Sequence, residues 1–277
     1  MLHEFSYIEP GSLSELLEFL AKYGPESAVF SGGTDLLISI RAGLEKPVYV
    51  VDLKKVPELQ ELNFGSKSGL SIGAAVNVNR VVEHEAVQSH YRILEIAGRE
   101  LATFQLRNRA TVIGNIVTAS PCGDMSSPLL CLDAEVELLS ASGSRSMLLK
   151  EFITGVKKTQ IKPEEIVSKI TVPTTFMDAA GGYEKLKRIK GHDLGVVAVT
   201  MIKTKKTMRV AVSSAAPTPV LLPDFVLDTP VAEIQKVAQA AISPIDDVRC
   251  TKEYRRFMVD IYIRRLLEEV QHERGAA

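Results

Sequence analysis

Two polar loops that contain glycine, at residues 31–35 and 105–124, interrupt a chain whose apolar segments are only long enough for single strands and helices. The apolar run Ser27–Phe30 leads straight into the first loop, and Val48–Leu53 follows it. Runs of this length predict buried strands. The two loops therefore lie at the edges of regular elements, where a ligand site is expected.

The first 173 residues predict a mixture of helices and strands. Asn79 is expected to cap a helix that continues to about Val87, and a second helix covers about residues 91–102. The second loop is too polar for a core segment, and about 20 residues of irregular chain in a compact domain are more often functional. Beyond it, residues 134–149 predict a hairpin and Ile166–Val172 a further strand.

The pattern changes after Thr174. Residues 182–188, 196–202 and 208–213 predict three antiparallel strands, and two helices follow. The fold class is therefore predicted to be α+β with two domains. Their bounds are residues 1–173, divided into two α/β subdomains near residues 55–65, and residues 174–277, a three-stranded antiparallel sheet with helices.

The spacing of apolar residues in the final helix predicts one apolar face. Tyr254, Phe257, Met258 and Ile261 follow the spacing i, i+3, i+4 and i+7. This spacing places the four side chains on one side of the helix.

Composition excludes several classes of function. The net charge of −1 provides no basic field for nucleic acid or an anionic membrane, and the longest apolar runs are far too short to span a bilayer. Met1–Pro10 already carries two acidic residues, unlike a signal segment. The sequence therefore predicts a cytoplasmic protein that binds neither nucleic acid nor membrane.

Three cysteines, Cys122, Cys131 and Cys250, form no CxxC pair. They cannot supply the four thiolates that an iron–sulfur cluster normally needs. Any electron carrier must therefore be organic or belong to another subunit.

Familiar catalytic motifs are missing from the sequence. It has no GxGxxG fingerprint, no Walker A sequence and no GxSxG elbow, and its five histidines are scattered. The sequence therefore predicts no metal ligands and no catalytic side chains.

The first loop, Ser31-Gly32-Gly33-Thr34-Asp35, has the composition of a pyrophosphate-binding turn. Adjacent glycines let the backbone take positive φ and approach a ligand closely. Successive N–H groups, with the Thr34 hydroxyl, can then surround a pyrophosphate. The alternative is an ordinary turn from strand to helix, with Thr34 or Asp35 as the cap.

The second loop mixes donors and acceptors. It offers hydroxyls at Thr111, Thr118 and Ser120, a carboxamide at Asn115 and a carboxylate at Asp124. A large polar ligand such as FAD needs this mixture for its phosphates and ribose hydroxyls. The alternative is a solvated loop.

Together, in this order and about 80 residues apart, the loops resemble those of the FAD-binding (medium) subunits of molybdenum hydroxylases, such as xanthine dehydrogenase and carbon monoxide dehydrogenase. The first loop is similar to the family's AGG-type segment, and the second to its A-T-x-G-G-N signature followed by Ala119-Ser120-Pro121. The resemblance continues at residues 165–173, 183–185, 192–195 and 253–256, so it covers nearly the whole chain.

The resemblance implies a fold and a set of site residues. The fold is a vanillyl-alcohol-oxidase (PCMH)-type FAD-binding domain followed by a small C-terminal α+β domain, like that of the carbon monoxide dehydrogenase flavoprotein. Backbone N–H groups of the first segment would hold the pyrophosphate: Ser31, Gly32, Gly33, Thr34, Asp35 and Leu36. The second wall would comprise Thr111, Gly114, Asn115, Thr118, Ser120 and Asp124. The backbone of Ile166 and Val167 would lie against the isoalloxazine ring, and Lys185 would approach its polar edge.

Four positions leave alternatives open. Lys185 is equally compatible with a solvated strand position. Ile113 replaces the family's first signature glycine and would be strained if that position required positive φ. Arg107 and Arg109 either form ion pairs with a partner or lie on a solvated face.

The function implied by the resemblance is electron transfer. A molybdopterin-binding large subunit would oxidise the substrate, a small subunit with 2Fe–2S clusters would carry the electrons, and this chain would pass them through FAD to NAD, in a dimer of heterotrimers. The arrangement of Thr118-Ala119-Ser120-Pro121 and Asp124 favours the xanthine dehydrogenase type. Carbon monoxide, nicotinate or aldehyde dehydrogenases with oxygen or a quinone as acceptor are alternatives, as is a flavin-free scaffold protein. A self-contained flavin oxidase would need a catalytic base, and the sequence offers no candidate.

Overall fold

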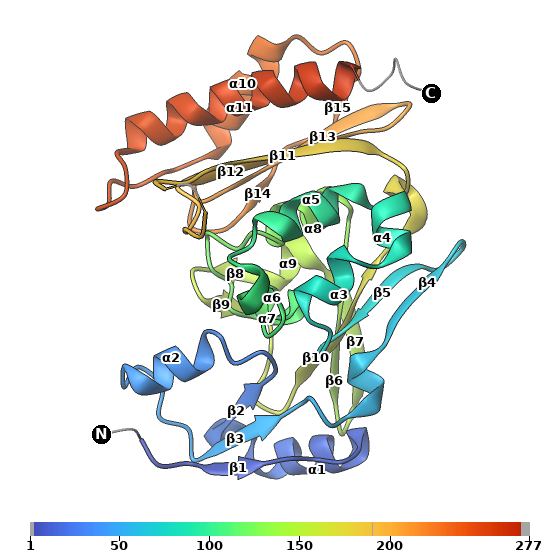
Figure 1. The fold of residues 1–277 in the computed structure, drawn as a ribbon, viewed down its shortest axis with the longest axis vertical. Coiled ribbons are helices and arrows are strands. Elements are labelled where there is room, and N and C mark those ends of the chain that lie inside the picture. The colour runs from blue at the N-terminus through green and yellow to red at the C-terminus, as the bar shows by residue number, and fades with distance from the viewer. Residues whose placement is uncertain (1–2, 190, 273–277) are drawn as a thin grey trace.

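The computed structural model describes residues 3–189 and 191–272. Its elements form three tiers along the long axis of the molecule (Figure 1). A small N-terminal sheet lies at one end, a larger sheet with a group of helices occupies the middle, and the C-terminal sheet with its two long helices lies at the other end. The predicted α+β class and its FAD-domain architecture are confirmed.

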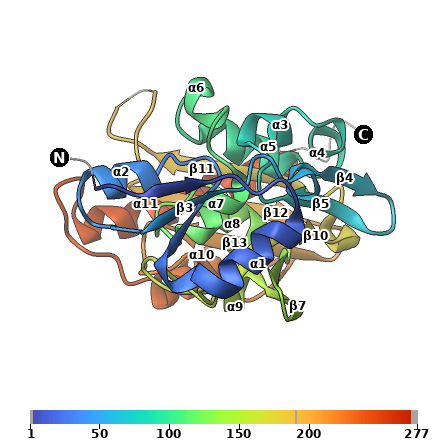
Figure 2. The same ribbon diagram turned by 90° about the horizontal axis from the view of Figure 1, so that it is seen from below.

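The N-terminal sheet is parallel, with the strand order β1-β3-β2. Its strands are β1 (Ser6–Ile8), β2 (Ser27–Phe30) and β3 (Tyr49–Asp52). Helix α1 (Leu13–Tyr23) and the 3-10 turn η1 (Gly24–Glu26) connect β1 to β2, and α2 (Leu36–Arg41) follows the first loop. Figure 2 shows this tier from below, with β1 and α1 in front. Ser12 caps α1 by accepting a hydrogen bond from the Glu15 N–H, so the helix begins directly after it.

The middle sheet is antiparallel, with the order β4-β5-β10-β6-β7. Its strands are β4 (Leu62–Gly65), β5 (Gly69–Gly73), β6 (Glu135–Ser140), β7 (Gly143–Leu148) and β10 (Ile166–Val172). The shorter elements are η2 (Pro57–Gln60), α9 (Leu149–Phe152), η3 (Thr174–Phe176) and the small hairpin β8 (Ile153–Gly155) and β9 (Lys158–Thr159). The predicted hairpin and the strand Ile166–Val172 are confirmed, and β10 is the central strand.

The chain between β5 and β6 forms six helices. They are α3 (Val78–Val82), α4 (Glu85–His90), α5 (Arg92–Glu100), α6 (Phe104–Arg107), α7 (Val112–Val117) and α8 (Ser126–Cys131). The predicted cap at Asn79 is wrong: Asn77 caps α3, and the buried Asn79 side chain donates to the Phe104 carbonyl. The second loop is also more regular than predicted. It contains α6 and α7, because Val112 and Ile116 bury their side chains in the core.

The position of Arg107 contradicts both alternatives that the sequence left open for it, an ion pair with a partner and a place on a solvated face. Its guanidinium is buried and donates to the carbonyls of Arg99 and Leu101, at 2.9 Å each, and to Asn79 Oδ1 at 3.0 Å. Burial lowers the pKa of Arg107. The side chain therefore ties α5 to α6, whereas Arg109 is exposed.

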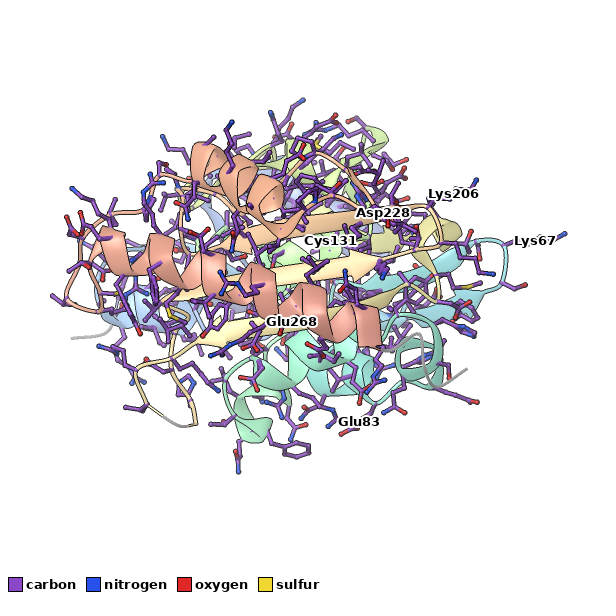
Figure 3. The ribbon with its side chains drawn as sticks, turned by 90° about the horizontal axis from the view of Figure 1, so that it is seen from above. Lys67, Glu83, Cys131, Lys206, Asp228 and Glu268 are labelled. Atoms are coloured by element: carbon purple, nitrogen blue, oxygen red, sulfur yellow. The ribbon has the colours of Figure 1, made fainter. Side chains whose placement is uncertain are left out.

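The C-terminal sheet has more strands than predicted. Its members are β11 (Ala180–Leu186), β12 (Val197–Lys203), β13 (Thr207–Ser213), β14 (Val220–Leu221) and β15 (Phe225–Val226). The first three are the predicted antiparallel strands, and the turn that carries Lys206 joins β12 to β13 (Figure 3). The two short strands both pair with β13. Two-residue strands carry too little periodicity to be predicted from sequence.

Helices cover both faces of the C-terminal sheet. Helices α10 (Val231–Ala241) and α11 (Lys252–His272) pack on the outer face, and α5 and α8 pack on the inner face (Figure 1). Tyr183 and Ala198 of this sheet belong to the same apolar core as the middle tier. The chain passes from the middle sheet to the C-terminal sheet between Val172, the end of β10, and Ala180, the start of β11. The domain boundary at residue 173, and the subdomain split near residues 55–65, stay predictions.

The predicted apolar face of α11 is right in part. Met258 is buried and Ile261 packs against the C-terminal core, but Tyr254 and Phe257 are 47% and 57% exposed, and their rings stack with centroids 6.1 Å apart. The buried side of the helix is displaced from the predicted one and comprises Arg255, Met258, Val259, Tyr262, Ile263, Leu266, Leu267 and Val270. Figure 3 shows α11, labelled at Glu268, running across the sheet.

None of the helices within residues 3–189 and 191–272 is long and apolar enough to cross a membrane.

Arg255 is the largest fully buried side chain of α11. Its Nη1 donates to the carbonyls of Val196 and Ser214, and its Nη2 lies 2.8 Å from Asp247 Oδ1. Asp247 is 20% exposed and keeps its ion pair with Arg249, so the main loss in Arg255→Met is the donor to the two buried carbonyls. A buried acceptor left without its donor costs about 1–3 kcal/mol. We therefore expect Arg255→Met to lower the free energy of unfolding by about 2 kcal/mol in urea titrations followed by circular dichroism.

Arg264→Met is the matched control, because Arg264 lies on the exposed side of the same helix. It should change the free energy of unfolding by no more than about 0.5 kcal/mol. Equal effects of the two substitutions would contradict the structural role of Arg255.

Candidate functional site

A cleft of about 430 Å³ is lined by the first loop of the N-terminal tier and by residues of α6 and α7. This volume falls within the range of cofactor and small-molecule sites, about 300–1,000 Å³. Fourteen of the fifteen residues expected to bind FAD line it: Ser31, Gly32, Gly33, Thr34, Asp35, Leu36, Thr111, Gly114, Asn115, Thr118, Ser120, Asp124, Ile166 and Val167. The fold therefore brings the two loops together, and the fifteenth residue, Lys185, lies behind the wall.

Neither glycine of the first loop can be replaced by a larger residue unless neighbouring atoms move. A Cβ at Gly32 would lie 2.3 Å from the carbonyl oxygen of Arg109. Gly33 has φ +71°, and a Cβ there would lie 2.0 Å from the Phe30 ring. The backbone therefore takes the positive φ expected for a ligand-binding turn. Asp35 precedes α2, but its side chain makes no capping hydrogen bond.

A polar cluster supports the first loop from below. The Lys54 ammonium lies 2.7 Å from Asp52 Oδ1 and 3.9 Å from the centroid of the Phe30 ring. The Tyr7 hydroxyl also donates to Asp52. Burial raises the pKa of Asp52, but the hydrogen bonds from Lys54 and Tyr7 outweigh it and hold the pKa below its usual value. The ring of Phe30, which lies against Gly33, is thus fixed in place.

Side-chain hydrogen bonds shape the second wall. Thr111 caps α7 by accepting from the Gly114 N–H at 2.9 Å, and it also accepts from the Ser31 hydroxyl at 3.3 Å. Asn115 Oδ1 accepts from the Met125 N–H at 3.2 Å. The Thr111 hydroxyl therefore links the two loops directly across about 80 residues of sequence.

A polar niche opens beside this wall at Gly123, which lines the cleft. A Cβ on Gly123 would lie 3.1 Å from both Asn115 Oδ1 and Ser126 Oγ. The Ser126 hydroxyl is buried and has no hydrogen-bond partner among the described residues. Buried hydroxyls are normally paired, so this one is suited to a polar group of a ligand. The sequence contained no signal for Ser126.

Ile113 is not strained. It lies within helix α7, is buried, and contributes to the wall of the cleft. The position of the family's first signature glycine is therefore helical in this chain, and a β-branched residue is tolerated there.

Asp124 and Lys185 form a buried ion pair. Lys185 Nζ lies 2.8 Å from Asp124 Oδ1, and only 1% of the lysine side chain is exposed, so the solvated alternative for Lys185 is wrong. The Tyr183 hydroxyl donates to Asp124 Oδ1 at 2.7 Å. Burial raises the pKa of Asp124, and it raises the pKa of Tyr183 well above its usual value. The carboxylate thus faces the cleft with the ammonium behind it.

The C-terminal tier supplies a third wall that the site prediction missed. His192, Asp193 and Leu194, from the segment between β11 and β12, line the cleft. The hydrogen bonds of Arg188 to Asp193 hold the pKa of that carboxyl well below its usual value and brace the segment. The family resemblance covers these residues, but only tertiary structure places them at the cleft.

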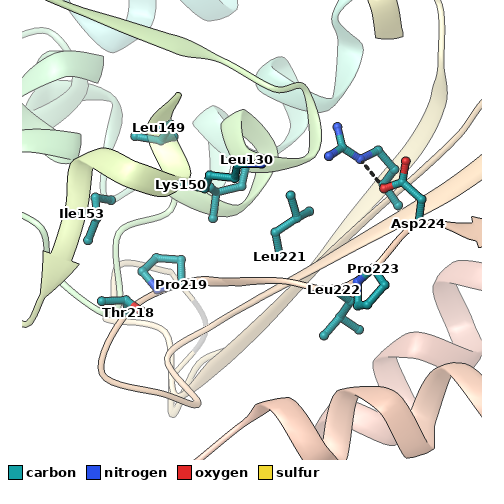
Figure 4. Close-up of a pocket in the computed structure, with 11 residues that line it drawn as sticks. Leu130, Leu149, Lys150, Ile153, Thr218, Pro219, Leu221, Leu222, Pro223 and Asp224 are labelled. Carbon is teal, nitrogen blue, oxygen red and sulfur yellow. Dashed lines mark hydrogen bonds and ion pairs between the residues drawn. The ribbon is translucent and has the colours of Figure 1, made fainter. Parts of the chain in front are cut away.

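A second pocket, also of about 430 Å³, lies where α8 and α9 meet the C-terminal sheet (Figure 4). Leu130, Leu149 and Leu221 line it together with Lys150 and Thr218. Its buried cation, Arg209, already binds Asp224 at 2.9 Å, Asp133 at 2.8 Å and the Cys131 carbonyl. None of the fifteen residues expected to bind FAD lines this pocket.

Within the described part of the chain, no group of three or more His, Cys, Asp or Glu residues could hold a metal ion.

A glycine turn with positive φ, a facing wall of hydroxyl and amide groups and an unpaired buried hydroxyl fit a dinucleotide flavin, so the fold and the cleft define an FAD-binding protein. Residues 3–175 match the family model described as the FAD binding domain in molybdopterin dehydrogenase. The chain belongs to this family and is an FAD-binding oxidoreductase subunit of the molybdenum hydroxylase type.

Known proteins agree with this assignment. The chain is 31% identical over 200 residues to the nicotinate dehydrogenase FAD-subunit of Eubacterium barkeri, covering 71% of this chain and 67% of that one. It is 27% identical over 275 residues to the carbon monoxide dehydrogenase medium chain of Hydrogenophaga pseudoflava, covering 95% and 96%. A chain of reconstituted CO dehydrogenase from Oligotropha carboxidovorans superimposes with a TM-score of 0.92 at 25% identity, covering 98% and 99%.

Gly33 allows a direct test of the cleft. In Gly33→Ala the new Cβ would strike the Phe30 ring, so the first loop must move away from its ligand-binding position. We expect FAD affinity of the apoprotein to fall by a factor of at least about ten, a loss of about 1.4 kcal/mol, in titrations that follow quenching of flavin fluorescence.

Gly43→Ala is the control. Gly43 has φ +72°, nearly that of Gly33, but a Cβ there meets nothing within 4 Å. The substitution should cost about 1 kcal/mol of stability through backbone strain and leave FAD affinity unchanged. Unchanged affinity in Gly33→Ala would place the cofactor elsewhere.

Proposed function

We propose that this chain is the FAD-binding electron-transfer subunit of a xanthine dehydrogenase-type molybdenum hydroxylase, and that it passes electrons from iron–sulfur clusters of a partner through FAD to NAD. The observation that carries the proposal is the gathering of both loops around one cleft. We further propose that all fifteen expected residues act in FAD binding, with Lys185 acting through Asp124.

Each wall of the cleft has a distinct task. Backbone N–H groups from Gly32 to Leu36 donate to the pyrophosphate, because a turn at positive φ points successive N–H groups in one direction. Thr118, Ser120 and Asn115 exchange hydrogen bonds with ribose and ribityl hydroxyls. The backbone of Ile166 and Val167, at the start of the central strand, supports the isoalloxazine ring. When bound, FAD supplies the redox chemistry, so the protein needs no acid–base pair.

The mouth of the cleft favours a protein partner. Val29, Ile38, Leu106 and Leu194 line it and are also exposed, Ile38 by 67%. Exposed apolar side chains that cluster at one opening are typical of a protein–protein interface. The partners we propose are a molybdopterin-binding large subunit and a small subunit with 2Fe–2S clusters, arranged as a dimer of heterotrimers in the cytoplasm.

The substrate of the complex depends on the large subunit. The Thr118-Ala119-Ser120-Pro121 segment with Asp124 supports the xanthine type. A carbon monoxide, nicotinate or aldehyde dehydrogenase with another electron acceptor is the second candidate. It is favoured by the similarity to carbon monoxide and nicotinate dehydrogenase subunits.

The visible spectrum of the purified chain tests the cofactor and the acceptor together. We expect flavin bands near roughly 370 and 450 nm, which NADH bleaches under anaerobic conditions. Bands that persist with NADH would overturn NAD as the acceptor. A folded, colourless chain that FAD cannot reconstitute would instead support a scaffold protein.

Reconstitution with the two proposed partner subunits tests the substrate. The complex should reduce NAD in the presence of xanthine, and this chain alone should not, because the substrate site lies in the large subunit. The rate is followed by NADH absorbance. Oxidation of carbon monoxide, nicotinate or an aldehyde, with no activity on xanthine, would favour the second candidate.

A further inference from the structure

We infer that Tyr183 is a positioning residue for the cofactor: its hydroxyl, held by the C-terminal sheet, orients Asp124 so that the carboxylate accepts a hydrogen bond from a donor group of FAD. The inference rests on the proposed binding of FAD in the cleft.

Two side chains of the single strand β11 bind the carboxylate of Asp124 on the side opposite the cleft. Tyr183 and Lys185 are two residues apart on β11, so their side chains leave the same face of the sheet. The tyrosine hydroxyl donates to Asp124 Oδ1 at 2.7 Å, and Lys185 Nζ lies 2.8 Å from Oδ1 and 3.0 Å from Oδ2. Both carboxylate oxygens are therefore bound on the side that faces away from the cleft.

The other side of the carboxylate remains available. Asp124 lines the cleft, whereas neither Tyr183 nor Lys185 does. An ionised carboxylate has about four acceptor positions and no donor. Its partner in the cleft must therefore be a hydroxyl or an N–H group, and FAD carries both.

Tyr183 contributes direction and Lys185 contributes charge. The tyrosine ring is buried in the apolar core shared with the middle tier, and it has only two side-chain torsions, so its hydroxyl position is fixed by packing. A lysine ammonium on a four-carbon stem is a point charge that can bind a carboxylate from many directions. Without the tyrosine hydroxyl, Asp124 can turn toward Lys185 and away from the ligand.

The surrounding charges are largely paired. Lys185 Nζ also donates to the Glu100 carbonyl at 3.2 Å, and the Glu100 carboxylate binds Lys187 at 2.7 Å. Cys122 is the remaining titratable neighbour on the same loop. Burial raises the pKa of Asp124, while the bonds from Lys185 and Tyr183 lower it. Loss of the tyrosine hydroxyl should therefore raise the pKa of Asp124 further.

Tyr183→Phe removes one oxygen atom and keeps the ring. We expect the FAD dissociation constant to rise about tenfold near neutral pH, the effect of one hydrogen bond to a charged group. FAD affinity should fall as pH decreases, because the ionised carboxylate of Asp124 accepts a hydrogen bond more strongly than the protonated acid does. Tyr183→Phe should move this fall to higher pH. Tyr262→Phe is the control, since Tyr262 is buried in the separate C-terminal core.

Two further variants separate the hydroxyl from packing. Tyr183→Met should weaken FAD binding as much as Tyr183→Phe if the hydroxyl matters; a loss in Tyr183→Met alone would reveal a packing role and overturn the inference. In an Asp124→Asn background, Tyr183→Phe should change the dissociation constant less than about twofold, because its effect passes through Asp124. A full tenfold loss in that background would also overturn it.

FAD binding by the wild-type chain distinguishes a failure of this inference from a failure of the proposed function. A wild-type chain that binds no FAD overturns both. A wild-type chain that binds FAD, with Tyr183→Phe unchanged in affinity and pH profile, overturns only the role of Tyr183.

Discussion

The close approach of Gly32 to the carbonyl of Arg109 is the contact on which the site depends. It brings the first loop within reach of the second, so that the Ser31 hydroxyl can bond to Thr111. Only a residue without a Cβ allows the two backbones to come so close. The N-terminal and middle tiers also share one apolar core, to which α1 contributes Leu16 and Leu20 and β3 contributes Val51. The cleft is the space between the two loops that this contact holds together.

The C-terminal tier completes the cleft and is part of its chemistry. It contributes the segment with His192 to the rim, and through β11 it holds Asp124 from behind. Tyr183 and Ala198 share an apolar core with the middle tier, whereas the outer face of the same sheet forms its own core with α10 and α11. Because the sheet belongs to both cores, a change in its packing also changes the cofactor wall.

Many polar groups of the cleft are already bonded within the protein. Thr111 caps α7, Asn115 holds the Met125 N–H and Asp124 is paired, so each arrives in a fixed orientation. Prior fixing of donors and acceptors reduces the entropy lost when a large ligand binds. This suits a subunit that binds FAD. Under the proposed function it also fits relatives that differ in substrate, since the substrate would be oxidised in the large subunit.

The sequence by itself determined the strands near residues 27–30, 48–53 and 166–172, the hairpin, the C-terminal trio of strands and the residues of both loops, because apolar periodicity and the demand for glycine at tight turns are local. It did not determine which face of α11 is buried, the burial of Arg107, or the helices within residues 105–124. Nor did it show that Lys185 stands behind Asp124, or that His192 reaches the cleft. Burial and pairing of these residues depend on segments distant in sequence, and only the packed tertiary structure brings those segments together.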